Sequence, residues 1–93
     1  MEKVKLSKKI TIDGKDTDVL ELDFDKVTGN MLIDAEKMMR TAGDMTPNPY
    51  FAQTFQSALA SKICPLSFIE LGKLPGKDFA KICTAVFTFL LGD

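Results

Sequence analysis

Residues 3–25, KVKLSKKITIDGKDTDVLELDFD, decide the fold. Apolar residues in the first half of this stretch share one parity: Val4, Leu6, Ile10 and Ile12. Polar residues occupy most of the positions between them, and Lys8 is the one that breaks the alternation. Alternation of this kind is typical of a strand with one buried face. The sequence therefore predicts that the chain begins with a half-buried strand.

A second alternating run follows the turn signal at residues 13–15, Asp-Gly-Lys. Its apolar face consists of Leu20, Leu22 and Phe24. A two-residue loop would pair Ile12 with Lys15 and set even positions against odd ones, which would divide the apolar set between two faces. We therefore predict a three-residue turn, with Gly14 in or beside a bulge, in an antiparallel hairpin over residues 1–26.

The acidic residues of the stretch 13–25 then lie on the solvated face of the hairpin. On that face the predicted pairing sets Lys3 and Lys5 across from Glu21 and Asp23, and such pairs add modest stability. The acids lack the spacing of a calcium-binding loop. We expect no metal site here.

A two-stranded hairpin is not stable alone, so the remaining residues must cover its apolar face. Thr28 is a good N-cap, Gly43 suits the end of a helix, Asn48-Pro49 suits the start of another, and Pro65 stops it. The predicted helices span 28–43, 49–64, 66–72 and 77–91. The chain is thus predicted to be one α+β domain, residues 1–93, in which an N-terminal antiparallel β-hairpin packs against three to four α-helices.

The charge and the residue composition argue against several classes of function. The formal net charge is −1, and of the 12 basic residues only Arg40 is not a lysine. That pattern is unlike a nucleic-acid binder, which needs clustered positive charge. The chain has no histidine, and Cys64 and Cys83 are too far apart for a redox or zinc motif, so both are expected to be free thiols. We expect no enzymatic activity and no cofactor.

The apolar run 82–92 is shorter than the roughly 20 residues that cross a bilayer, so no membrane span is expected. The same run is one of two features that suggest protein binding. The other is the predicted helix 49–64, because no charge occurs between Asp44 and Lys62 and an exposed helix usually carries charge. Core packing would also suit Phe87 and Leu90. The candidate partner-binding residues are Phe51, Phe55, Leu59, Phe87, Phe89, Leu90 and Leu91.

Several short motifs resemble those of one protein family. They are the acidic strand VLELDF at residues 19–24, the helix start TGNMLIDAE at 28–36, and LPGKDF at 74–79 before a closing helix. In this order they resemble the tail assembly chaperones of long-tailed bacteriophages, the group with the small E-type proteins and their Mu-like counterparts. The resemblance covers nearly the whole chain.

The resemblance implies a non-enzymatic protein that binds the phage tape measure protein in the host cytoplasm and keeps it soluble. It also implies that the chain is absent from the mature virion, that it contacts the tail tube protein or a frameshifted longer form of itself, and that it self-associates. The residues leave a second interpretation open, a self-associating structural or interaction subunit of a phage or cellular assembly. A transcriptional regulator would need a basic recognition helix, and no predicted helix is basic.

Overall fold

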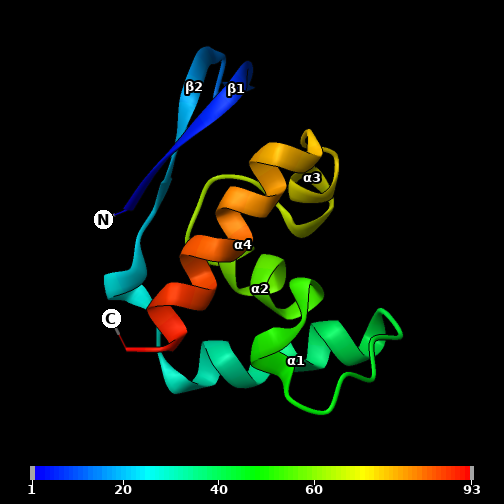
Figure 1. Cartoon of the computed structure of the whole chain (residues 1–93). Helices are drawn as coiled ribbons and strands as arrows, with labels where there is room; N and C mark the ends of the chain where they lie inside the picture. The colour runs from blue at the N-terminus through cyan, green and yellow to red at the C-terminus, as the bar shows by residue number, and fades with distance from the viewer. Residues whose placement is uncertain (1, 93) are drawn as a thin grey trace.

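A computed structural model describes residues 2–92, and Figure 1 shows its arrangement. The prediction of an α+β fold is confirmed: an antiparallel hairpin is followed by four α-helices. The elements are β1 (Glu2–Ile12), β2 (Lys15–Leu22), the 3₁₀ turn η1 (Phe24–Lys26), α1 (Gly29–Thr41), the 3₁₀ turn η2 (Pro49–Phe51), α2 (Gln53–Ser61), α3 (Phe68–Gly72) and α4 (Gly76–Leu90).

The hairpin closes with a two-residue turn, because Ile12 pairs directly with Lys15. Asp13 and Gly14 both have positive φ, 52° and 78°, as a type I′ turn requires. The predicted three-residue turn is therefore wrong. Aspartate tolerates the left-handed region better than most residues, and glycine has no Cβ to clash there.

The change of parity that the apolar pattern demands lies in β1 instead. Lys5 pairs with Val19, whereas Ile10 pairs with Thr17. Residues 6–9 of β1 consequently lie opposite a single residue of β2, and they form a bulge. Lys8, which breaks the alternation in the sequence, belongs to this bulge.

The bulge brings even-numbered apolar residues of both strands into register on one face. Val4 pairs with Leu20, and both are buried, as are Leu6 and Leu22. The predicted pair of Lys3 with Glu21 is also present, while Lys5 forms an ion pair with Asp18 instead of Asp23. Beyond the bulge, the two isoleucines of β1 are only half-buried.

One hydrophobic core joins the hairpin to all four α-helices. α2 lies at its centre, in contact with α1, α3 and α4, and α4 also packs along β1 (Figure 1). The largest fully buried apolar side chains are Leu20, Leu22, Met39, Phe55, Leu59, Leu71, Ile82 and Val86.

Capping residues set the ends of α1 and α3. The Thr28 hydroxyl accepts a hydrogen bond from the Met31 amide, and Gly43 follows α1 with a φ of 93°. α3 begins with a reciprocal capping box, in which Ser67 and Glu70 each accept from the other's backbone amide. α3 and α4 match their predicted positions to within two residues.

The predicted continuous helix over 49–64 is wrong. Asn48 does cap a turn that begins at Pro49, but this turn is only η2, and Ala52 is extended before α2 begins. The Gln56 side chain reaches back and donates to the Tyr50 carbonyl at 2.8 Å, which holds η2 against α2. α2 then ends at Ser61, three residues before Cys64.

Candidate partner-binding surface

An aromatic pair links η2 to the end of α4. The rings of Phe51 and Phe87 are tilted by 47° with centroids 5.5 Å apart, and 63% of Phe51 remains exposed. Leu91 follows Phe87 by one helical turn on the same side of α4, and it is 60% exposed. We call Phe51, Phe87 and Leu91 the aromatic edge.

Phe89 and Leu90 do not share this degree of exposure. Phe89 stacks on Phe24 of η1, with centroids 4.7 Å apart and an interplanar angle of 14°, so it ties the end of α4 to the segment after the hairpin. Leu90 is half-buried against the core. The apolar end of α4 therefore serves two purposes, fastening the fold on one side and exposing side chains on another.

Phe55 and Leu59 are core residues, which corrects their prediction as partner contacts. They are 1% and 0% exposed, and every residue of α2 from Phe55 to Ala60 is buried. The lack of charge in this helix has an internal cause, because α2 is covered by the chain's own elements. Of the candidates between residues 49 and 64, only Phe51 reaches the surface.

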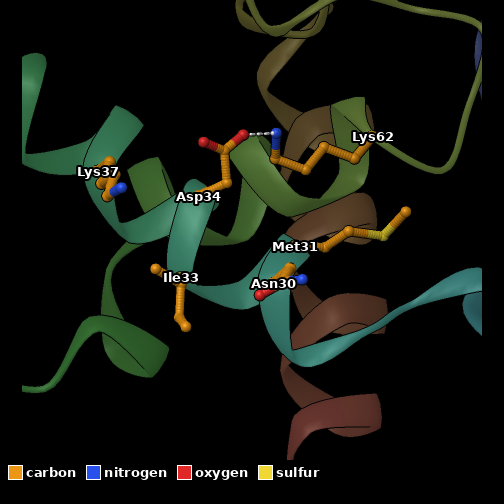
Figure 2. A pocket seen from close by; sticks show the side chains of 6 residues that line it. All are labelled: Asn30, Met31, Ile33, Asp34, Lys37 and Lys62. Carbon is orange, nitrogen blue, oxygen red and sulfur yellow. Dashed lines mark hydrogen bonds and ion pairs between the residues drawn. The ribbon is translucent and has the colours of Figure 1, made fainter.

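A hollow of about 420 Å³ lies between α1 and the end of α2. Figure 2 shows the side chains that line it. Its lining is Asn30, Met31, Ile33, Asp34, Lys37 and Lys62. Lys62 forms an ion pair with Asp34 across it, and this hydrogen bond lowers the pKa of the Asp34 carboxyl. The lining lacks a nucleophile beside a general base, so we assign this hollow a structural role, that of joining α2 to α1.

A more apolar hollow of about 460 Å³ lies between the end of α1 and α3. Its lining is Lys37, Met38, Thr41, Ala42, Phe68 and Ile69. Ile69 is 70% exposed, the highest value among the exposed large apolar residues. The sequence reasoning missed this hollow, since it treated α3 only as a short connecting helix.

Asp78 and the two cysteines are ionisable residues that the fold buries wholly or in part. Asp78 is the one buried acid of the described chain, and both of its oxygens accept hydrogen bonds from Ser7, at 2.9 and 2.8 Å. Cys64 and Cys83 are free thiols, as predicted. Burial raises the pKa of both, that of Cys83 to about 11, which disfavours the reactive thiolate.

Within residues 2–92, no three His, Cys, Asp or Glu side chains come together as a group that could hold a metal ion. None of the helices in this part of the chain has the length and apolar character needed to cross a membrane. Comparison with family models, curated proteins and solved structures finds no match for this chain.

Proposed function

We propose that the chain is a non-enzymatic tail assembly chaperone of a long-tailed bacteriophage, which binds the tape measure protein and keeps it soluble during tail assembly. The observation that carries the proposal is the aromatic edge: Phe51 packs on Phe87 and yet is 63% exposed, and Leu91, one helical turn after Phe87, is 60% exposed. The resemblance of residues 19–24, 28–36 and 74–79 to that family supplies the identity of the client.

The aromatic edge suits a client that presents apolar side chains without a fixed tertiary structure. Aromatic side chains provide large contact area at a low cost in conformational entropy. Each apolar side chain that a client covers contributes about 1.5–3 kcal/mol when it is fully buried. A long helical client that repeats an apolar stripe can engage such an edge by laying one face against it.

The remainder of the surface suits the proposed role in the host cytoplasm. The chain carries 12 basic and 13 acidic residues, which favours solubility while a few apolar side chains stay exposed. Two free thiols are typical of a protein that works in a reducing compartment.

The test is co-expression of the full chain with a segment of a tape measure protein, measured as the soluble fraction of that segment. The double variant Phe51→Gln, Leu91→Gln should reduce the soluble fraction and weaken binding by about tenfold or more. Ile69→Gln is the matched control, because Ile69 is at least as exposed but lies on α3. Circular dichroism should show that all variants remain folded.

Equal solubilisation by the double variant and the wild type would contradict the proposed contact surface. Size-exclusion chromatography with light scattering separates the proposal from the structural-subunit interpretation. A monomer or weak oligomer that binds the client supports the chaperone. A stable closed ring that ignores the client would replace it with a self-associating subunit.

A further inference from the structure

The exposed face of α4 changes in character along the helix. Near the start of α4 it presents Lys77 and Lys81, and both residues are exposed. Between Lys81 and Gly92 the chain has no charged residue. One exposed row on α4 consists of Lys77, Thr84 and Leu91, which follow one another at intervals of seven residues, about two helical turns. The face is therefore basic at one end and apolar at the other.

Lys77 and Lys81 carry positive charge that no acid within residues 2–92 neutralises in an ion pair. Lys81 Nζ donates instead to the Lys5 carbonyl at 3.1 Å. The carboxylate of Asp78, beside Lys77 in the sequence, is buried, and both of its oxygens accept hydrogen bonds from Ser7. The charge of the two lysines is thus available to a carboxylate of another molecule.

The position of these lysines is unfavourable for the stability of α4. Like charges four residues apart on a helix repel one another. Lys77 also lies in the first turn of α4, where the helix dipole disfavours positive charge. Arrangements that lower stability without a visible gain inside the fold are expected at functional sites. An acidic group of a partner would relieve both unfavourable effects.

The length of the row sets the size of the partner. From Lys77 to Leu91 the helix rises by about 21 Å. A partner helix of about 15 residues covers this length, so it can contact the aromatic edge and the lysines at the same time. A hollow of about 360 Å³ beside the row is lined by Glu2 and Lys81, among others. Because Glu2 shares this hollow with Lys81 and not with Lys77, we place the partner's carboxylate nearest to Lys77.

We propose that the exposed face of α4 sets the direction in which the client lies on this chain. An amphipathic helix of the client binds the aromatic edge with its apolar side chains, and an acidic side chain about 20 Å farther along that helix faces Lys77 and Lys81. The apolar contact supplies affinity, and the charge supplies orientation. This inference rests on the proposed function, because both use the aromatic edge.

The test uses the full chain and a labelled, designed helical peptide of about 18 residues, with a leucine stripe along its length and glutamates at one end only. A matched peptide has glutamines in place of the glutamates. Fluorescence anisotropy should show that the glutamate peptide binds about fivefold more tightly than the glutamine peptide at low salt. This preference should shrink as the salt concentration rises, while the binding of the glutamine peptide stays nearly constant.

A spin label reports the direction of the bound peptide. With a nitroxide at the acidic end, paramagnetic broadening should be strongest for the amide signals around Lys77. With the nitroxide at the other end, it should be strongest for the amide signals around Leu91.

A charge reversal separates binding from folding. Lys77→Glu should weaken binding of the glutamate peptide about fivefold and leave the glutamine peptide within about twofold. The same variant should raise the midpoint of urea unfolding, because it removes the repulsion from Lys81 and places an acid in the first turn of α4. Lys37→Glu is the matched control, since Lys37 is an exposed lysine on α1, and it should leave binding of both peptides within about twofold.

The inference is overturned if the glutamate peptide does not bind, if both peptides bind equally at low salt, or if both spin labels broaden the same signals. It is also overturned if light scattering shows a dimer of the free chain that Lys77→Glu dissociates, since a second copy would then occupy this face. In each case the proposed function survives as long as Phe51→Gln, Leu91→Gln still reduces the soluble fraction of the tape measure segment. If this double variant changes neither that fraction nor peptide binding, the aromatic edge is not the contact surface and both proposals fail.

Discussion

Asp78, in the first turn of α4, accepts hydrogen bonds from both the amide and the hydroxyl of Ser7, which lies in the bulge of β1. The two residues are 71 positions apart in the sequence. The bulge frees the Ser7 amide from the ladder, and the buried carboxylate replaces the missing strand partner. This contact fixes the hairpin against the helical layer at the point where its pairing is irregular.

Loss of the Asp78 carboxylate should destabilise the fold. Asp78→Ala removes a buried carboxylate that accepts both the amide and the hydroxyl of Ser7, and it should lower the free energy of unfolding by about 1–3 kcal/mol. Asp78→Asn retains one acceptor and should cost less. Urea denaturation measures both, with Asp25→Ala as the control, expected within about 0.5 kcal/mol of the wild type. Equal stability of the Asp78 and Asp25 variants would contradict this assignment.

The sequence predicted the hairpin and its buried face, but it did not predict the register of the two strands or the place where their pairing changes parity. The even-numbered apolar residues of both strands can share one face only if an odd number of residues is added to a regular hairpin with a two-residue turn. The alternation of apolar residues does not show where between Leu6 and Leu20 these residues are added. Both the turn and a bulge within a strand can hold the added residues. Asp13 and Gly14 both tolerate positive φ, so the turn takes the short form and the extra residues fall in β1.

Gly14 should be sensitive to substitution for a backbone reason alone. A Cβ at Gly14 would meet no atom within 4 Å, but its φ of 78° is unfavourable for alanine. Gly14→Ala should cost about 1 kcal/mol in thermal or urea unfolding. Gly72→Ala is the control, because Gly72 also has open space but lies in α3 without a positive φ. It should be neutral or stabilising by up to about 1 kcal/mol.

The absence of charged residues between Asp44 and Lys62 did not locate the partner-binding surface. A helix without charged residues can be covered by its own domain as well as by a partner. The residues between Asp44 and Lys62 could be covered by a partner or by the chain itself, and composition does not distinguish these cases. The helical spacing of the apolar residues was misleading as well. It predicted one continuous helix over 49–64, with Phe51, Phe55 and Leu59 on the same face. The break at Ala52 turns Phe51 outward toward Phe87.

Phe51 and Phe55 should therefore respond very differently to the same substitution. Phe55→Ala removes a side chain that is 1% exposed from the centre of the core and should cost about 3–5 kcal/mol. Phe51→Ala removes a side chain that is 63% exposed and should cost less than about 1 kcal/mol. Chemical denaturation of the two variants is a direct test. Similar losses would mean that η2 packs more tightly than the structure shows.

Cys83 should make the stability of the fold depend on alkaline pH. Burial raises the pKa of its thiol to about 11, from an ordinary value of 9.0, and the sulfur lies 4.0 Å from the Gln53 carbonyl. Between these two values the unfolded chain has lost the proton while the folded chain keeps it. The unfolded state then binds fewer protons, so the free energy of unfolding falls as the pH rises through that window.

Cys83→Ala tests this dependence, because it removes the thiol and leaves the lysines that titrate in the same range. Urea unfolding of both proteins from pH 8 to pH 11 should give curves that converge as the pH rises, since only the wild type loses the contribution of the neutral thiol. The variant starts lower because the vacated space destabilises it at every pH. A constant difference between the two proteins across the window would show that Cys83 ionises as readily in the folded chain as in the unfolded one.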